Sequence, residues 1–441
     1  MDTFSNCFED FDMTSFSRFF ELATGQQPYA YQRELGELPQ PPSVLNVPTG
    51  AGKTQALIVS WLYSRRELGV APRRLVYALP MRTLVEQTVD VARDIRSRLE
   101  IDDEELPIHV LMGGAEPAEL RDWRLSPERD QILIGTIDML LSRALNRGYA
   151  ESRFAWPVAF GLLNNDCRWV FDEVQLMGSA RATSAQLDGL RAKLGTILPC
   201  ETVWSSATID RTALRTVDRT DLGGVLSLPS EDRKGALRVR LDARKTLERL
   251  EVGESTGGEL AAHVAQAAVD RHQKDTRTLV VLNTVELAQS VYRALGALAR
   301  GADVESVLLH SRFRPVERAA NMRRALAEPE GEGTIVVATQ VVEAGVDFSA
   351  RTLVTETAPF LSVVQRLGRC NRAGEFEQAA VVWLDRGPLV DETIGRKLAA
   401  PYRLVDIAAA RSALLGLEGV SLSPAALEQI EVAESPDDPA I

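Results

Sequence analysis

Short runs of β-branched and apolar residues alternate with longer helical patterns over most of this chain. In the first half, these runs occupy residues 44–47, 74–79, 132–135, 168–171 and 202–206. After a polar, turn-rich interval that begins near Ile209, they resume at 278–282, 306–309, 334–338, 353–355 and 380–384. Strands that alternate with helices are typical of βαβ units. The pattern therefore predicts an α/β protein with two successive parallel sheets.

The polar interval predicts a domain boundary within residues 229–236. A chain of 441 residues exceeds the usual domain size of roughly 150 residues. We expect an N-terminal extension over 1–27, a first α/β domain over 28–230, a second over 231–388, and a helical extension with an acidic tail over 389–441.

Charge and cysteine content restrict the class of protein. Lys and Arg total 50 against 62 Asp and Glu, a formal net charge of -12. This balance argues against a protein that coats nucleic acid by bulk electrostatics, so any nucleic-acid track must be local. The cysteines Cys7, Cys167, Cys200 and Cys370 form no CxxC pair, and no histidine stands at metal-ligand spacing from them. We expect a reduced, cytoplasmic protein without zinc, a membrane span or a signal peptide.

A glycine-rich turn follows the first predicted strand, where residues 47–54 read VPTGAGKT and lead into a helical pattern. Backbone N–H groups in such a turn face phosphate oxygens at the positive end of the helix. Lys53 is expected to reach the terminal phosphates and Thr54 to hold Mg²⁺. The other residues of the turn that we expect at the phosphates are Thr49, Gly50, Ala51 and Gly52. The alternative is a surface turn that merely contains GKT.

A pair of carboxylates ends another apolar run, in WVFDEVQ at residues 169–175. Asp172 is the candidate metal ligand and Glu173 the candidate base that orients water. A DE pair alone is usually a solvated strand end. Together with the phosphate loop, it predicts a nucleoside triphosphatase that uses ATP and Mg²⁺, at the carboxyl ends of the strands.

The motifs VPTGAGKT, FDEVQ, SSAT (205–208), TQVVEAGVD (339–347) and QRLGRCNRAG (365–374), in this order, resemble those of superfamily 2 helicases. The last two strings and the DEVQ box are most similar to the helicase of type I CRISPR interference systems. The resemblance covers residues 28–384 and implies two tandem RecA-like domains with a nucleotide cleft between them. Val47 departs from the generic phosphate-loop pattern by standing where the first glycine is expected, which favours a helicase-like loop.

The resemblance also assigns residues to the nucleotide. Tyr29 and Gln32 correspond to an adenine-reading segment, although a helix start packed on the core is the alternative. In the second domain, the residues implied to meet the nucleotide or its phosphates are Gly345, Asp347, Gln365, Arg369 and Arg372. The neighbouring Arg366 is expected to face elsewhere. Gln175, Ser206 and Thr208 are implied to couple hydrolysis to the nucleic-acid strand.

Strand-contacting motifs are implied at the ends of other strands. In the first domain these residues are Pro80, Arg82, Thr83, Gly113, Gly114, Thr136 and Asp138. In the second they are Asn283, Thr284, Arg312, Thr339 and Gln340. Small residues and hydroxyls beside helix N-termini hold phosphates without reading bases, so binding is expected to be sequence-tolerant. For Thr284 and Asp138, an ordinary helix cap is an equal alternative.

The resemblance implies a single-stranded DNA translocase that moves 3′ to 5′ and works with an RNA-guided surveillance complex and an HD nuclease. No histidine here forms an HD pair, so we expect the nuclease to be a separate subunit or an excised part. Another RNA or DNA-repair helicase is the first alternative, because sequence does not decide the sugar. An ATP-gated clamp that hydrolyses slowly and a protein-translocating motor are the others.

Overall fold

The structure, a computed structural model, describes residues 15–113, 122–149, 151–207, 214–253, 255–298, 304–343, 345–389, 392–427 and 430. The chain divides into two compact units, Met1–Arg233 and Lys234–Ile441. Each is an α/β unit built on its own sheet of seven strands. The predicted fold class of two parallel-sheet α/β domains is therefore confirmed.

The sheet of the first unit is parallel throughout, in the order β3-β4-β2-β5-β6-β1-β7. Its strands are β1 (Val44–Asn46), β2 (Arg74–Leu79), β3 (Ile108–Leu111), β4 (Gln131–Thr136), β5 (Cys167–Phe171), β6 (Cys200–Ser206) and β7 (Val225–Ser227). Because every strand runs the same way, the carboxyl ends of β5, β6 and β1 lie side by side at one edge of the sheet.

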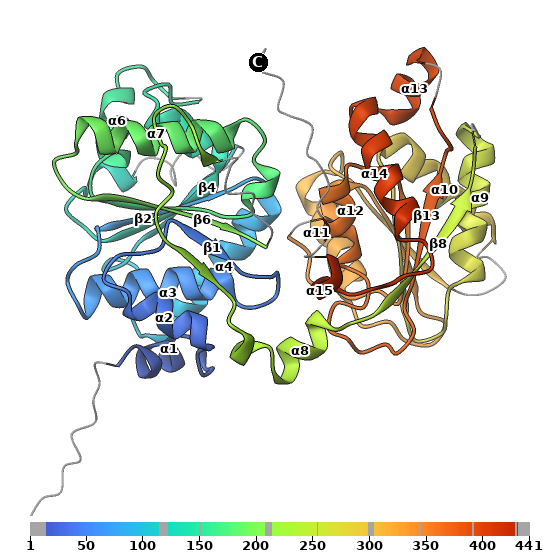
Figure 1. The fold of residues 1–441 in the computed structure, drawn as a ribbon, viewed down its shortest axis with the longest axis horizontal. Coiled ribbons are helices and arrows are strands. Elements are labelled where there is room, and N and C mark those ends of the chain that lie inside the picture. Colours follow the sequence, from blue (N-terminus) through green and yellow to red (C-terminus); the bar gives the residue numbers. More distant parts are fainter. Residues whose placement is uncertain are drawn as a thin grey trace, which may run out of the picture. The chain divides into compact units, whose positions relative to one another are not determined.

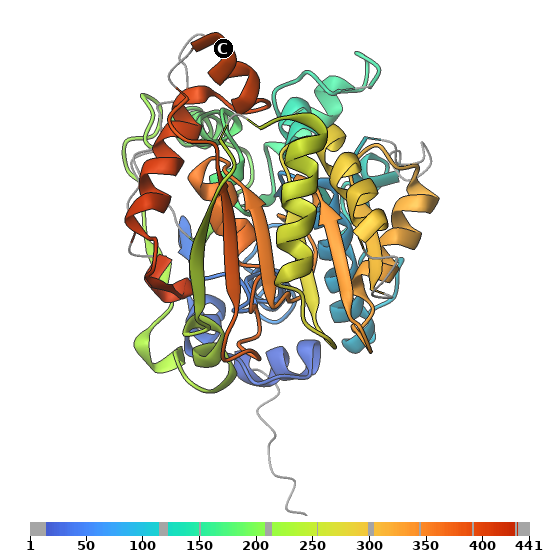
Figure 2. The same cartoon turned by 90° about the vertical axis from the view of Figure 1, so that its right-hand side faces the viewer.

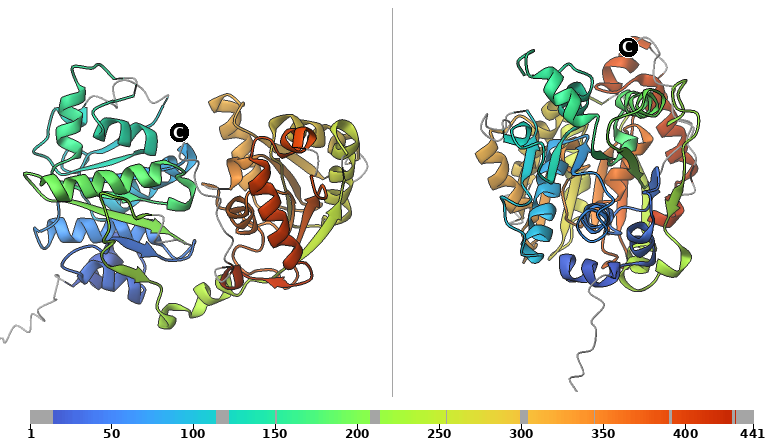
Figure 3. Two further views of the ribbon diagram at one scale, coloured as in Figure 1. Left: turned by 45° about the horizontal axis from the view of Figure 1, so that its top comes forward. Right: turned by 90° about the vertical axis from the view of Figure 1, so that its left-hand side faces the viewer.

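Helices cover both faces of this sheet (Figures 1 and 3). One layer holds α1 (Phe16–Thr24), α2 (Ala30–Glu37), α3 (Lys53–Arg66) and α4 (Arg82–Arg98). The other holds α5 (Ile137–Ala144), α6 (Trp156–Leu163) and α7 (Ala180–Leu194). Burial on both faces explains why the central strands are continuous apolar runs and not alternating ones.

The second sheet has the order β10-β11-β9-β12-β13-β8-β14 and is parallel except for β14. Its strands are β8 (Lys245–Glu251), β9 (Arg277–Val281), β10 (Glu305–Leu309), β11 (Thr334–Ala338), β12 (Thr352–Glu356), β13 (Ala380–Asp385) and β14 (Ser421–Leu422). The carboxyl ends of β10, β11, β9 and β12 are thus neighbours, which brings several of the sequence motifs to one edge.

Two helical layers also enclose the second sheet. On one face, seen in front of the strands in Figure 2, lie α9 (Gly257–Asp270) and α10 (Val285–Leu298). The opposite face is covered by α11 (Pro315–Leu326), α12 (Phe360–Leu367), α14 (Leu404–Gly416) and α15 (Pro424–Leu427). The remaining helices are α8 (Gly235–Leu241) and α13 (Glu392–Ala399).

The sequence pattern misses four strands, β3, β7, β8 and β14, although it finds β10 at the other edge of the second sheet. β3 and β7 form the edges of the first sheet, and β8 alternates buried Lys245 and Leu247 with exposed residues. The C-terminal extension, predicted as helices, also contains β14, which pairs antiparallel with β8. These four strands contain few consecutive buried positions, so they lack the apolar run by which the other strands are found. The acidic tail at 431–441 lies outside the described residues.

A glycine contact fixes one helix of the first unit. At Gly189 of α7, an added Cβ atom would lie 2.3 Å from the backbone oxygen of Asp218. Ion pairs hold the same loop on the helix, from Lys193 to Asp218 at 2.9 Å and from Arg219 to Asp188. The loop can approach α7 this closely only because position 189 has no side chain.

We predict that Gly189→Ala lowers the stability of the first unit by about 1–3 kcal/mol, because the methyl group meets backbone atoms. Gly161→Ala is the matched control in α6, where nothing lies within 4 Å of the added Cβ. It should raise stability by up to about 1 kcal/mol through helix propensity. Urea midpoints measured by circular dichroism test both, and a stabilised Gly189→Ala protein would contradict the predicted contact.

Candidate functional site

The phosphate loop of the first unit has the conformation that the sequence predicts for it. It follows β1 and ends at Gly52, the N-cap of α3. Gly50 and Gly52 have φ angles of 84° and 80°, in the left-handed region that favours glycine. The exposed Thr49 and Gly50 lead into the buried Ala51. The loop therefore presents backbone N–H groups at a helix N-terminus, as anion binding requires.

A chain of polar contacts crosses the carboxyl ends of β1, β5 and β6. Lys53 Nζ donates to the Val47 carbonyl at 3.0 Å and lies 3.9 Å from Glu173 Oε1. Glu173 Oε2 accepts from Gln175 Nε2 at 2.5 Å, and Gln175 Oε1 accepts from the Ser206 hydroxyl at 2.6 Å. Of the residues implied to couple hydrolysis to the strand, Gln175 and Ser206 are thus in contact, while Thr208 lies outside the described residues.

Glu173 has an unusual backbone. Its φ angle is 53°, a left-handed conformation uncommon for a residue with a side chain. Such strain persists only where the surroundings fix it, and it is found mostly at functional sites. Here the fixed backbone aims the carboxylate at Lys53 and Gln175.

Asp172 lies deeper than Glu173 and is held on both oxygens. Tyr77 donates to Oδ2 at 2.8 Å, and the Glu173 backbone N–H donates to Oδ1 at 3.0 Å. Burial raises the pKa of Asp172, the neighbouring Glu173 raises it further, and Lys53 acts in the opposite direction. Burial also raises the pKa of Tyr77, on which Asp172 acts in the same direction.

The donor set around Asp172 fits a magnesium ion. The two carboxylate oxygens offer about four lone-pair sites, so a site remains for a cation even with Tyr77, the Glu173 N–H and Ser205 as donors. The Thr54 hydroxyl lies in the same cluster, at hydrogen-bond range of Tyr77. Mg²⁺ in nucleotide sites takes one or two protein oxygens and completes its shell with phosphate and water. No group of three or more His, Cys, Asp or Glu with metal-binding geometry occurs in the part of the chain that the structure describes.

The predicted adenine-reading segment supports the phosphate loop. Tyr31 donates its hydroxyl proton to the Ala51 carbonyl at 2.6 Å, and Gln32 Nε2 lies 3.3 Å from the Gly52 carbonyl. Gln32 is 2% exposed, and its Oε1 accepts from the Tyr29 backbone N–H at 2.9 Å. The structure thus gives Gln32 a role in holding the loop, where the sequence predicted a contact with adenine.

An acidic residue from the end of the first unit holds this segment. Asp232 accepts from the backbone N–H groups of Ala30 at 2.7 Å and Tyr31 at 2.9 Å, one on each carboxylate oxygen. These N–H groups open α2, so Asp232 caps the helix that carries Tyr31 and Gln32. The sequence gave no signal for this contact, because the partners are separated by 202 residues.

The predicted strand-contacting residues of the first unit lie beyond β2, β3 and β4. Arg82 is exposed, and its Nη2 atom lies 2.8 Å from where a Cβ atom on Gly113 would be. Pro80, Thr83 and Thr136 are partly exposed and Asp138 is exposed in the first turn of α5. Gly114 lies outside the described residues. The ends of β2 and β3, on either side of β4, thus bring Arg82 and Gly113 together.

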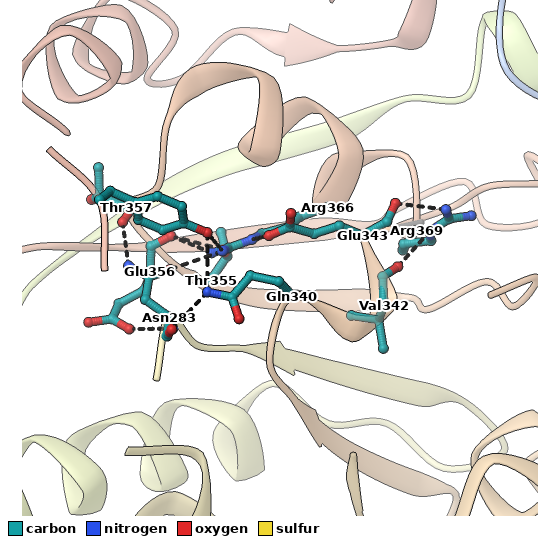
Figure 4. A network of polar contacts seen from close by, with 10 residues as sticks. Asn283, Gln340, Val342, Glu343, Thr355, Glu356, Thr357, Arg366 and Arg369 are labelled. Carbon is teal, nitrogen blue, oxygen red and sulfur yellow. Dashed lines mark hydrogen bonds and ion pairs between the residues drawn. The ribbon is translucent and has the colours of Figure 1, made fainter. Parts of the chain in front are cut away.

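In the second unit, a buried polar network surrounds Arg366 (Figure 4). The side chain is fully buried and forms an ion pair with Glu343 at 2.8 Å. Its other N–H groups donate to Thr355 Oγ1, the Glu356 carbonyl, Asn283 Oδ1 and the Tyr402 hydroxyl. A guanidinium has five N–H donors, so all five have acceptors. Burial raises the pKa of Glu343 although Arg366 acts in the opposite direction.

Arg369 and Arg372 differ in their surroundings. Arg369 is 5% exposed and donates to the carbonyls of Val342 at 2.9 Å and Glu343 at 2.8 Å. Arg372 is 26% exposed, and its Nε lies 2.8 Å from Asp347 Oδ1. The structure therefore gives Arg369 contacts within its own unit, and it presents Arg372 together with the exposed Asp347.

Other predicted residues of the second unit fall into two groups. Asn283 is 5% exposed and Thr339 is 2% exposed, so the structure uses both internally. Thr284 caps α10 by accepting from the Leu287 N–H at 3.3 Å, which is the alternative considered for it. The partly or fully exposed members are Gln340, Arg312, Gln365 and Gly345, of which Gly345 has a φ angle of 72°.

None of the helices in the described ranges is long and apolar enough to cross a membrane.

Two family models match separate parts of the chain. The DEAD/DEAH box helicase family matches residues 38–216, and the C-terminal domain of the CRISPR-associated nuclease/helicase Cas3 matches residues 274–375. These segments contain the phosphate loop and carboxylates of the first unit and, except for Tyr402, the Arg366 network of the second.

Two curated relatives carry the name Cas3, as the second of these family models does. A CRISPR-associated helicase Cas3 from Thermoproteus tenax is 27% identical over 77% of this chain and 55% of its own length. A putative CRISPR-associated nuclease/helicase Cas3 from Myxococcus xanthus is 29% identical over 81% of this chain and 45% of its own length. The chain thus spans about half the length of these relatives.

A solved structure shows the same fold. T. fusca Cas3 with AMPPNP is similar with a TM-score of 0.65 at 18% identity, over 94% of this chain and 54% of that one. Taken with the ordered motifs and the geometry of the phosphate loop, these likenesses show that the chain is similar to DEAD/DEAH box helicases in its first unit and to the CRISPR-associated helicase Cas3 over most of its length, and that it shares the fold of T. fusca Cas3.

Proposed function

We propose that this chain is a nucleic-acid-stimulated ATPase that moves along single-stranded DNA, 3′ to 5′, in type I CRISPR interference. The observation on which the proposal depends is the contact chain from Lys53 through Glu173 and Gln175 to Ser206. It joins the phosphate loop and the candidate base to the motif that follows β6. The proposed partners, an RNA-guided surveillance complex and an HD nuclease, are those that the motif resemblance implies, and the relatives' names give a CRISPR association and a nuclease/helicase.

In this proposal, the first unit holds the triphosphate. The loop from Thr49 to Thr54 binds phosphate oxygens, and Lys53 releases the Val47 carbonyl to meet the terminal phosphate. Thr54 and Asp172 would hold Mg²⁺, which supplies charge neutralisation at the β- and γ-phosphates when bound. Glu173 orients the attacking water and accepts its proton.

The second unit would supply positive charge to the γ-phosphoryl group. Arg372 suits this role, because it is partly exposed and its partner Asp347 is exposed to solvent. Arg369 would hold the turn at Val342 and Glu343 and would contact phosphate only by exchanging these carbonyls. Adenine recognition by Tyr29 and Gln32, and nucleotide contacts at Gly345 and Gln365, stay predictions.

An ATP-gated clamp is disfavoured by the position of Glu173. A clamp has no need for a base held in a strained backbone beside the phosphate loop. The direct test is ATP hydrolysis by the purified chain with Mg²⁺, measured with and without single-stranded DNA or RNA of matched sequence. Stimulation by DNA supports the proposal, greater stimulation by RNA favours another superfamily 2 helicase, and no stimulation by either contradicts strand-driven movement.

We predict that Glu173→Gln keeps ATP binding while turnover falls by a factor of about 10²–10⁴, the usual contribution of a general base. Lys53→Ala should lose both nucleotide binding and turnover, because it removes the phosphate-binding ammonium group. Fluorescent nucleotide titration and phosphate release separate these outcomes. Normal hydrolysis by Glu173→Gln would show that the base has been assigned to the wrong residue.

We also predict that Asp232→Ala raises the KM for ATP more than it lowers kcat. The change removes the cap of α2, worth about 0.5–2 kcal/mol, and loosens the segment that supports the phosphate loop. Asp242→Ala is the control, since Asp242 forms an exposed pair with Arg238 within α8 and its C-cap. Equal KM values in both variants would show that the Asp232 contact does not support the nucleotide site.

A further inference from the structure

Gln340 lies at the carboxyl edge of the second sheet, where the sequence predicts contacts with a nucleic-acid strand. It follows β11 and begins a short 3-10 helix, Gln340–Val342. Its Nε2 donates to the Asn283 backbone carbonyl at 2.7 Å and to the Tyr402 hydroxyl at 3.2 Å. An amide nitrogen has two N–H groups, so both are used inside the protein.

The orientation of this amide follows from its partners. A backbone carbonyl can only accept, so the atom 2.7 Å from Asn283 O must be the nitrogen of Gln340. Arg366 Nη2 lies 3.5 Å from the Tyr402 hydroxyl, and a guanidinium only donates, so that hydroxyl acts as an acceptor toward the network. The Gln340 amide is therefore fixed with its oxygen directed away from the network, as Figure 4 shows.

The group that Gln340 offers to a ligand is thus its carbonyl oxygen, Oε1. The residue is partly exposed, in contrast to the buried Asn283 and Thr339 beside it. An amide oxygen accepts hydrogen bonds but cannot donate, and phosphate oxygens also only accept. Gln340 held in this way cannot bind the phosphates that its sequence motif implied.

We infer that Gln340 binds a hydrogen-bond donor of the strand, either a base N–H group or a ribose 2′-hydroxyl, and that Tyr402 is its positioning residue. This rests on the proposed function, because it assumes a strand at the carboxyl edge of the second sheet. It adds a contact that depends on the nucleoside to a track whose other members hold phosphates. It also makes the C-terminal extension, to which Tyr402 belongs, a part of strand recognition.

Tyr402 reaches Gln340 from a different part of the sequence. It stands between α13 and α14, and α14 packs against α12, which carries Arg366. Burial raises the pKa of Tyr402, which keeps the hydroxyl neutral. Without this hydroxyl, one N–H group of Gln340 loses its partner, and the amide is held by the bond to the Asn283 carbonyl alone.

The test measures binding of fluorescent strands to the full chain by anisotropy, for the parent protein, Gln340→Met and Tyr402→Phe. The probes are an oligothymidylate, an abasic DNA of the same length, an oligouridylate and its 2′-O-methyl form. They share the phosphate backbone and differ in base N–H groups and in the ribose hydroxyl. Tyr292→Phe is the matched control, because Tyr292 packs beside the α9–α10 core, away from the network.

Gln340→Met should weaken oligothymidylate binding by about threefold to tenfold, as expected for one lost hydrogen bond, and leave abasic DNA unchanged. If the donor is the ribose, only oligouridylate binding weakens and its 2′-O-methyl form does not. Tyr402→Phe should narrow the difference between thymidylate and abasic strands, because it leaves the amide held by one hydrogen bond in place of two. Tyr292→Phe should leave all affinities as in the parent.

Equal weakening of the abasic strand by Gln340→Met would assign the side chain to phosphate and overturn the inference. So would unchanged binding of every strand, or a Tyr402→Phe protein whose preferences match the parent while thermal melting shows both variants folded. If the parent itself binds none of the strands, the proposed function fails together with this inference.

Discussion

Two neighbouring carboxylates buried at one strand end, with an ammonium group beside them, are the constraint on which the nucleotide site depends. Asp172 and Glu173 are adjacent carboxylates in a low-dielectric environment, and the Lys53 ammonium group lies 3.9 Å from Glu173, so its positive charge offsets part of their repulsion. Burial raises the pKa of Asp172, the charge of Glu173 raises it further, and Lys53 acts in the opposite direction. A triphosphate would add negative charge at the same place, so a divalent cation is needed to balance the cluster. The backbone N–H groups of the loop favour an anion, and the excess of carboxylates favours a cation. Together they favour one ligand, a metal–nucleotide complex.

The second unit differs, because the buried charge at its centre is a cation and not a pair of carboxylates. Its central cation, Arg366, is fully buried and all of its donors are satisfied within the protein. Such a residue cannot reach a ligand, but it fixes the turns around it, because breaking any one bond leaves a buried polar group unpaired. Contacts with a ligand would then come from partly exposed residues of this unit, such as Arg372 and Gln340. Because the interior is rigid and few polar groups are exposed, only a small number of side chains in this unit are available to bind a ligand.

Most of the fold could be predicted from the sequence, because the central strands are buried on both faces and appear as apolar runs. The strands β3, β7, β8 and β14 could not, since few of their consecutive positions are buried and they show little hydrophobic pattern. At the site, local spacing predicted that Lys53, Glu173, Gln175 and Ser206 meet at strand ends. It could not show that the polar groups of Gln32, Asn283 and Arg369 form hydrogen bonds within the protein.

The residues that sequence reasoning missed depend on distant contacts. Tyr77 meets Asp172 over a separation of 95 residues, and Tyr402 meets Gln340 over 62. Asp232 caps α2 over 202 residues, so during synthesis that helix leaves the ribosome long before its capping carboxylate is made. The contact between Asp232 and α2, which supports the phosphate loop, must therefore be among the last features of the first unit to form. A nascent chain halted short of Asp232 would have every residue of its ATP-binding motif and still lack the support that holds it in shape.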